Sequence, residues 1–264
     1  MPVALIIPAR LSSTRLPRKM LLSDTGKPLL THTVERALQI AEHSGGLVTR
    51  VVVAIDDESL RAAASVGAAE VKMTDPNHKS GTDRIAEAAA KLPEEIIVNL
   101  QGDEPLMPVD NALTACRLLT QGGHDAPMGT LVTPLVAGKD DAAIANPAVV
   151  KCVIGYGPGW GNLRTACALY FSRHSIPFVR PGDGVPPSPR CYQHLGIYAY
   201  RREFLLGYGN LPPSRLETAE KLEQLRALEA GYRIAVAVVK TSPLGIDTPE
   251  EYRRFVETLK SQTS

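Results

Sequence analysis

Along the first half of the chain, short apolar runs alternate with segments whose apolar residues have helical spacing. Three runs are almost free of polar residues, as expected of parallel strands covered on both faces: 3–7, 51–55 and 96–100. Apolar positions at helical spacing lie between them, in segments that begin near Pro28 or cover 58–66 and 81–91. This alternation predicts a doubly wound α/β sheet.

The second half is richer in strands. Its β-branched and apolar runs predict strands over 128–135, 149–154, 166–171, 195–200 and 234–239, with a proline-rich loop over 181–189. A long helix is predicted over 215–230, and a last one begins at Thr248. We therefore predict a single α/β domain over 1–264, with a mostly parallel sheet and an inserted β-rich portion at about 165–212.

Composition narrows the function classes. The chain has 264 residues, 44% of them hydrophobic and 22% charged, which is typical of a globular protein. Its net charge of +1 provides no global field for nucleic acid. The four cysteines form no CxxC pair, so neither a disulfide framework nor a zinc site is expected. The N-terminal apolar run is too short to cross a membrane and follows no basic segment, so we expect a cytoplasmic protein without membrane association.

The segment after the first predicted strand, 8–19, is the most informative stretch of the chain. It combines four basic side chains (Arg10, Arg15, Arg18 and Lys19) with three hydroxyls (Ser12, Ser13 and Thr14). Ligands in such sheets bind beyond the carboxyl ends of the strands, and a triphosphate needs cations and donors from several directions. The segment lacks the glycines of a P-loop or a dinucleotide motif. It predicts a phosphate site, with a solvated basic loop as the alternative.

Two acids are candidate magnesium ligands. Asp103 follows the third apolar run, where a carboxylate can hold Mg²⁺ against phosphate oxygens, although Gly-Asp-Glu-Pro is also a turn sequence. Thr248 and Glu251 have the spacing of a capping box. Because Thr248 caps the last helix, Asp247 is free to serve as a second magnesium ligand; a surface acid beside a cap is the alternative.

Other polar groups lie near predicted strand or helix ends. Residues 80–84 begin a helix and present backbone N–H groups and Arg84 to a nucleotide, or form an ordinary Ser80 cap. Arg173, His194 and Tyr198 suit an acidic, hydroxyl-rich substrate. Glu223 and Gln224 add a polar pair on the long helix, whose solvated face is the alternative.

Taken together, these segments resemble the 3-deoxy-manno-octulosonate cytidylyltransferases, or CMP-Kdo synthetases. The similarity extends from Ile6 to about Phe255 and is carried by IIPARLSSTRLPRKM, GKPLLTHTVERA, SGTDRIAEA, IVNLQGDEPLMP, ALYFSR, HLGIYAYR, LEQLRALEAG and GIDTPEEY. Each stretch is weak alone, but their order and spacing are specific. The chain departs from the family where 18–21 reads Arg-Lys-Met-Leu instead of Gly-Lys-Pro-Leu, where Asp83 replaces Glu, and in the short segment 180–190.

The resemblance implies a Rossmann-like nucleotidyltransferase fold and transfer of CMP from CTP to 3-deoxy-D-manno-octulosonate (Kdo). It further implies Mg²⁺ as cofactor, a homodimer formed through the β-rich portion, and a role in lipopolysaccharide synthesis. The implied catalytic residues are Arg10, Lys19 and Asp103, and the implied metal ligands are Asp103 and Asp247. The implied nucleotide-binding residues are Pro8, Ala9, Arg10, Ser13, Arg15, Lys19, Thr74, Ser80, Gly81, Arg84, Gln101 and Gly102. The implied sugar-binding residues are Gln101, Arg173, His194, Tyr198, Glu223 and Gln224.

Three alternatives remain open at this point. A cytidylyltransferase for a sialic or 8-amino sugar acid would share all the nucleotide chemistry. A glycosyltransferase of similar architecture would lack the basic segment. A non-catalytic nucleotide-sugar sensor should have lost Lys19, Asp103 or Asp247, and this sequence keeps all three.

Overall fold

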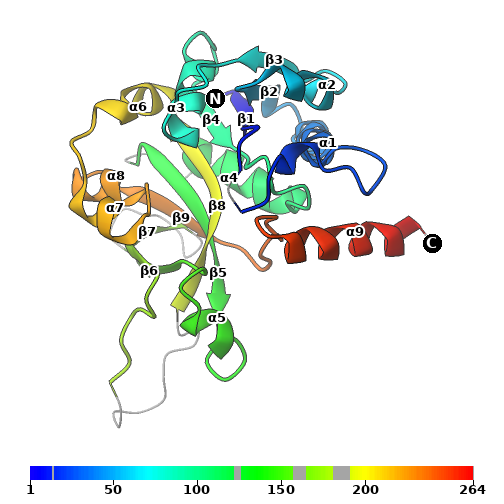
Figure 1. Cartoon of the computed structure of the whole chain (residues 1–264). Coiled ribbons are helices and arrows are strands. Elements are labelled where there is room, and N and C mark those ends of the chain that lie inside the picture. Colours follow the sequence, from blue (N-terminus) through cyan, green and yellow to red (C-terminus); the bar gives the residue numbers. More distant parts are fainter. Residues whose placement is uncertain (14, 122–125, 157–164, 181–190, 264) are drawn as a thin grey trace. The chain divides into compact units, whose positions relative to one another are not determined.

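The computed structural model describes residues 1–13, 15–121, 126–156, 165–180 and 191–263 (Figure 1). It divides into two compact units, of which the first joins 1–116 to 243–264 and the second comprises 117–242. The proline-rich loop predicted over 181–189 lies outside the described residues. The single domain with an insertion at about 165–212 stays a prediction.

The first unit contains a parallel sheet of four strands. They are β1 (Val3–Ala9), β2 (Val48–Ile55), β3 (Glu70–Met73) and β4 (Ile96–Asn99), in the order β3-β2-β1-β4. All seven residues of β1 are buried, as its continuous apolar run predicted. The sequence did not predict β3, whose residues are all partly or fully exposed. Since the strands are parallel, their carboxyl ends share one edge of the sheet.

Three helices of this unit follow the predicted segments: α1 (Leu29–Glu42), α3 (Gly81–Ala89) and α9 (Pro249–Thr263). The sequence did not predict α4 (Val109–Gln121), which ends in the second unit. The helix predicted over 58–66 is instead a 3₁₀ turn, η2 (Glu58–Leu60), followed by the one-turn α2 (Arg61–Ala64). Ser65 leaves the helical conformation at ψ 83°, which ends α2 early.

A small core cluster joins α9 to the segment that follows β1. It consists of Leu16, Leu29, Ile246, Tyr252, Phe255 and Val256. The backbone N–H of Asp24 also donates to the Tyr252 hydroxyl at 3.0 Å. These contacts bring the residues before α9 beside the basic segment, although more than 200 positions separate them in sequence.

The second unit has five strands in the order β8-β5-β9-β7-β6, and β6 also pairs with β8. They are β5 (Met128–Leu135), β6 (Lys151–Gly155), β7 (Thr165–Ser172), β8 (Cys191–Arg201) and β9 (Ile234–Val238). Among the described pairs of these strands, β5 and β9 are parallel and the other pairs are antiparallel. The five predicted strands are confirmed, with β8 extending further toward the N-terminus than its apolar run indicated.

The prediction of one long helix over 215–230 is wrong. The segment forms α7 (Arg215–Glu220) and α8 (Leu225–Glu229), separated by Lys221 in the left-handed region at φ 53°. The Arg173 guanidinium accounts for the break, because it donates to the backbone carbonyls of Glu220 at 2.7 Å and Lys221 at 3.3 Å. These are the carbonyls that a continuing helix would have used. The remaining short helices are α5 (Asp141–Ala145), α6 (Arg202–Gly207) and the 3₁₀ turn η3 (Tyr208–Asn210).

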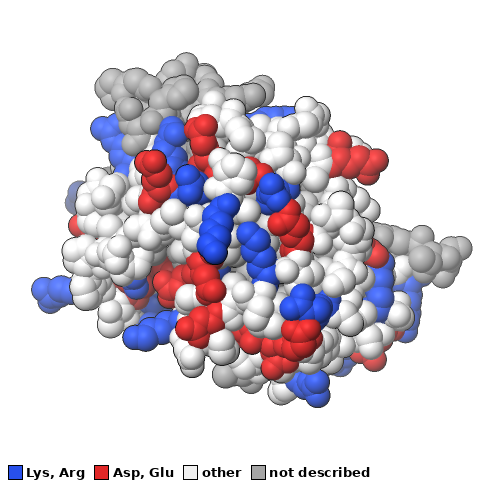
Figure 2. All heavy atoms as spheres, turned by 90° about the horizontal axis from the view of Figure 1, so that it is seen from above, with Lys and Arg blue, Asp and Glu red and all other residues white. Residues whose placement is uncertain are grey.

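The surface carries charges of both signs. On the face shown in Figure 2, Lys and Arg side chains lie interspersed with Asp and Glu, in keeping with the net charge of +1. Within the described ranges, no helix combines the length and the apolar character needed to cross a bilayer.

Candidate functional site

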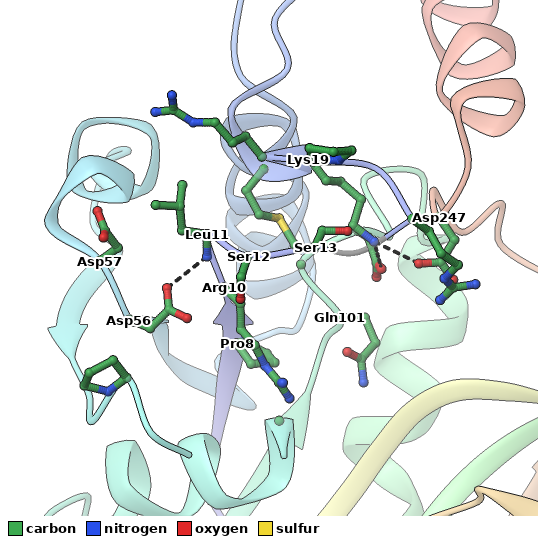
Figure 3. A pocket seen from close by; sticks show the side chains of 18 residues that line it. Pro8, Arg10, Leu11, Ser12, Ser13, Lys19, Asp56, Asp57, Gln101 and Asp247 are labelled. Carbon is green, nitrogen blue, oxygen red and sulfur yellow. Dashed lines mark hydrogen bonds and ion pairs between the residues drawn. The ribbon is translucent and has the colours of Figure 1, made fainter. Parts of the chain in front are cut away.

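A pocket of about 910 Å³ lies in the first unit, where β1, β2 and β4 end (Figure 3). Its lining comes from the end of β1 and the basic segment, from the ends of β2 and β4, from the stretch between β3 and the start of α3, and from the residues before α9. The lining residues are Pro8, Arg10, Leu11, Ser12, Ser13, Arg15, Pro17, Arg18, Lys19, Met20, Asp56, Asp57, Pro76, Gly81, Gln101, Gly102, Asp103 and Asp247. Four of these side chains are basic and four are acidic, so the lining itself is close to neutral.

Asp56, directly after β2, fixes the start of the basic segment. Its carboxylate accepts from the backbone N–H of Leu11 at 2.9 Å (Figure 3). Arg84 of α3 is fully buried and donates to Thr74 and, at 3.5 Å, to Asp56. Burial lowers the pKa of Arg84, and the Asp56 carboxylate opposes that change. The ion pair therefore links α3, β2 and the basic segment.

Lys19 lies between the two predicted metal ligands. Its ammonium donates to Asp103 Oδ2 at 2.6 Å and to Asp247 Oδ1 at 2.9 Å, and Figure 3 shows the Lys19 side chain directed at Asp247. The side chain is only 8% exposed. Burial alone would lower the pKa of Lys19, but the two carboxylates outweigh it and raise that pKa above its usual value. Arg15, which is 66% exposed, binds the other oxygen of Asp247 at 2.9 Å. The two carboxylates thus share one buried cation.

Backbone contacts hold the two acids together. The N–H of Ile246 donates to the carbonyl of Asp103 at 3.0 Å, which joins the two segments directly. The predicted capping box is confirmed: Glu251 accepts from Thr248 N at 2.8 Å, and the Thr248 hydroxyl accepts from Glu251 N at 3.3 Å. Glu251 also accepts from Asp247 N at 2.9 Å. The Asp247 carboxylate is therefore not needed for capping, as the sequence indicated.

Gly102 permits the close approach of β1 and the turn after β4. A Cβ on this residue would lie 2.8 Å from the carbonyl oxygen of Pro8 and 3.0 Å from the Met20 side chain. The Thr33 hydroxyl donates to the Gly102 carbonyl at 2.8 Å and holds the turn from α1. Only glycine fits here without displacing the backbone.

Glu104 is a buried acid beside this cluster that the sequence analysis did not select. Burial, together with the carboxylates of Asp103 and Asp247, raises the pKa of Glu104 to about 8. One of its carboxyl oxygens has no hydrogen-bond partner among the described residues. At neutral pH Glu104 is therefore mostly protonated and adds little negative charge to the cluster.

The predicted nucleotide-binding residues fall into two groups. Those that line the pocket are Pro8, Arg10, Ser13, Arg15, Lys19, Gly81, Gln101 and Gly102. The other four, Ala9, Thr74, Ser80 and Arg84, are not among its described lining residues. Thr74 and Arg84 support Asp56 from within the fold, and the Ser80 hydroxyl caps α3 by accepting from Asp83 N at 3.0 Å. Ser80 therefore caps α3, and its contact with a nucleotide stays a prediction.

Arg10 lies apart from the two acids. A Cβ on Gly81 would lie 3.9 Å from the Arg10 guanidinium, which places that cation at the N-terminus of α3. The guanidinium and the helix N-terminus both favour an anion. The pocket therefore favours an anion near α3, whereas the Lys19 ammonium is bound by two carboxylates.

Of the predicted sugar-binding residues, only Gln101 belongs to the first unit. In the second unit, the His194 and Tyr198 rings of β8 lie 5.2 Å apart, and the Thr130 hydroxyl lies 3.0 Å from His194 Nε2. Desolvation lowers the pKa of His194 to about 3, so its imidazole is neutral at physiological pH. Arg173 donates to backbone carbonyls at the break after α7, and Glu223 follows that break closely in the sequence. Gln224 is buried, and its amide nitrogen has no partner among the described residues.

The donor set fits magnesium better than zinc. The described residues contain no group of three or more His, Cys, Asp or Glu side chains that could hold a metal ion. Magnesium commonly uses one or two carboxylates and completes its coordination with substrate phosphates and water. Asp103 and Asp247 converge on one cation and meet that requirement.

Sequence reasoning missed Asp56, Asp57 and Glu104. Asp56 and Asp57 directly follow an apolar run that becomes a parallel strand, and this position alone marks them as candidates. The signal for Glu104 was its place beside Asp103; its burial was not visible in the sequence.

Comparisons with known proteins agree with one another. A family model described as "Cytidylyltransferase" matches residues 4–234. The 3-deoxy-manno-octulosonate cytidylyltransferase of Syntrophobacter fumaroxidans is 44% identical over 257 residues, covering 96% of this chain and 95% of its own. Its counterpart in Polynucleobacter necessarius is 45% identical over 258 residues, covering 96% and 94%.

Solved structures give the same result. A CMP:2-keto-3-deoxy-manno-octonic acid synthetase complexed with CTP superposes with a TM-score of 0.85 at 37% identity, covering 99% of this chain and 100% of that one. A cytidylyltransferase from Leptospira borgpetersenii matches with a TM-score of 0.60 at 17% identity over 99% of this chain and 87% of its own, which shows the fold alone. The predicted α/β nucleotidyltransferase fold is therefore confirmed.

Proposed function

Since the chain belongs to the 3-deoxy-manno-octulosonate cytidylyltransferase family, we propose that it transfers CMP from CTP to Kdo, giving CMP-Kdo and pyrophosphate. The observation that carries this proposal is the convergence of Lys19, Asp103 and Asp247 in one pocket with the basic segment. A phosphate site that combines basic side chains with two acids suits a nucleoside triphosphate together with a divalent cation.

The chemistry requires little more than positioning and charge compensation. The anomeric hydroxyl of the sugar attacks the α-phosphorus of CTP and loses its proton to solvent; a P–O bond forms, the P–O bond to the β-phosphate breaks, and pyrophosphate leaves. Arg10 and Lys19 compensate the charge that develops on the phosphates. Asp56 and Arg84 hold the basic segment in place for this task.

The near-neutral pocket lining supports a role for a divalent cation, because a triphosphate brings more negative charge than this lining can balance. Asp103 and Asp247 would hold Mg²⁺. When bound, the ion supplies charge neutralisation at the phosphates and favours ionisation of the sugar hydroxyl.

Gln101, Arg173, His194, Tyr198, Glu223 and Gln224 are the proposed sugar-binding residues. His194 serves there as a neutral hydrogen-bonding group, because its pKa is about 3. The Nε, Nη1 and Nη2 groups of Arg173 each donate to a backbone carbonyl. Its proposed contribution is therefore to shape the loop that carries Glu223 and Gln224 as well as to attract an acidic substrate.

The wider setting is also part of the proposal: a cytoplasmic homodimer that supplies activated Kdo for lipopolysaccharide synthesis, without nucleic-acid or membrane partners. Two apolar side chains in the portion predicted for dimerisation support the homodimer, since Leu169 is 61% and Phe178 is 81% exposed. Sedimentation of the parent and a Leu169→Ser, Phe178→Ser variant tests the assembly. A monomeric parent would contradict it.

Pyrophosphate release tests the activity. With CTP and Mg²⁺, we expect turnover with Kdo to exceed that with 8-amino-Kdo or a sialic acid. Asp103→Asn and Asp247→Asn should each lower kcat by at least ~10²-fold, while Asp110→Asn, on the exposed side of α4, should leave it unchanged. Near-normal turnover in both pocket variants would remove the metal assignment. No turnover with any sugar acid would refute the function.

A further inference from the structure

The position of the Lys19 ammonium has a consequence for metal binding. It donates to Asp103 Oδ2 and Asp247 Oδ1, so one cation binds an oxygen of each acid. A divalent cation held between both acids would take the position that the ammonium now occupies. Two cations cannot share these oxygens closely, because their mutual repulsion grows as water is excluded.

The backbone around Lys19 is fixed, so any exchange must occur in its side chain. Lys19 begins the 3₁₀ turn η1 (Lys19–Leu21), where its N–H donates to Leu16 O and its carbonyl accepts from Leu22 N, both at 3.2 Å. The flexible four-carbon side chain, in contrast, borders the same pocket as the rest of the basic segment. The ammonium can therefore leave the acids and reach a pocket ligand without a change in the fold.

We propose that Lys19 is an internal counter-ion that holds the two acids together before substrate binds and leaves them for the nucleotide phosphates when a divalent cation enters. This inference rests on the proposed magnesium site. The ammonium and the metal compete for the acids, but the ammonium and the phosphates attract each other. Nucleotide therefore strengthens metal binding, and metal strengthens nucleotide binding by the same factor.

The proposal makes an unexpected prediction: removal of a residue needed for turnover should improve metal binding. Lys19→Met retains the length of the side chain but removes its charge. In the absence of nucleotide it should bind Mn²⁺ at least ~10-fold more tightly than the parent, because the competing cation is gone. Lys27→Met is the matched control, since Lys27 forms an ion pair with Glu35 outside the pocket and is 39% exposed. It should bind Mn²⁺ as the parent does.

Mn²⁺ binding is measured from the electron paramagnetic resonance signal of the free ion, with Mn²⁺ alone and with CTP. Thermal melting provides a second measurement: Mn²⁺ should raise the Tm of Lys19→Met more than that of the parent, because only the variant lacks the ammonium between the two acids. Lys19→Gln repeats both measurements if the methionine variant does not fold.

The outcomes separate this inference from the proposed function. Tighter Mn²⁺ binding by Lys19→Met that is lost in Lys19→Met, Asp103→Asn supports the exchange. Equal or weaker binding by both Lys19 variants, with binding still dependent on Asp103 in the parent, overturns the exchange and leaves the metal site standing. Mn²⁺ binding that is indifferent to Asp103 and Asp247 in every protein, with and without CTP, overturns the metal assignment itself.

Discussion

Gly102 provides the sharpest test of how closely the site is packed. In Gly102→Ala the new methyl group would lie 2.8 Å from the carbonyl oxygen of Pro8, about 0.6 Å inside an ordinary contact of 3.4 Å. The Met20 side chain can move aside, but the Pro8 carbonyl belongs to the β1 backbone and cannot. The turn that carries Asp103 must therefore shift by about that distance.

The expected cost follows from this shift. Overpacking of this kind destabilises a protein by ~1–3 kcal/mol. A displacement approaching 1 Å at a catalytic group costs up to ~10²-fold in rate. We therefore expect a decrease of ~10- to 10²-fold in kcat/KM for CTP, measured by pyrophosphate release, and a lower midpoint of urea unfolding.

Gly245→Ala is the matched control. A Cβ at Gly245 meets nothing within 4 Å, although the residue precedes Ile246, which donates to Asp103. It should retain parental activity and gain up to ~1 kcal/mol from reduced freedom of the unfolded chain. If Gly102→Ala matched this control in both stability and kcat/KM, the close-approach argument would be wrong.

Three further predictions concern stability. Because the pKa of His194 is about 3 in the folded protein, the unfolded state binds more protons than the folded state below pH ~6.5. The stability advantage of the parent over His194→Gln should therefore shrink by up to ~1.4 kcal/mol per pH unit as the pH falls from ~6.5 toward about 3. An advantage that is independent of pH in urea titrations would contradict this. Thr248→Ala should cost ~1 kcal/mol in urea unfolding by removing the α9 cap, and Thr248→Ser should recover most of it; equal stability of all three proteins would exclude the cap. Asp56→Ala should lower the free energy of unfolding by ~1–3 kcal/mol, because it leaves buried Arg84 without its carboxylate. It should also raise the KM for CTP, because the backbone N–H of Leu11 loses its acceptor. An unchanged KM would show that the basic segment does not depend on Asp56.

The sequence predicted those parts of the fold that depend on continuous apolar runs. Strands such as β1 and β2 are buried on both faces, and their composition shows it directly. It missed β3, because a short strand with four partly or fully exposed residues has no such pattern. It also predicted one helix where α7 and α8 lie, since the break is set by Arg173 from a distant strand end rather than by a local glycine.

The same division applies to the site. The basic segment and Asp103 were found because they follow predicted strands, and the capping box left Asp247 free for another role. What the sequence could not give was the position of the Lys19 ammonium between the two acids, which requires the burial and the backbone contacts of both segments. Asp56 could have been found by applying the same strand-end rule to β2.

The direct backbone link from Ile246 to Asp103 also constrains the order in which the enzyme becomes competent. During synthesis, 143 residues lie between Asp103 and Asp247, and the entire second unit leaves the ribosome between them. A nascent chain has the strands β1, β2 and β4 early, yet it lacks both the second acid and the α9 residues that pack on Leu16 until that long stretch has been made.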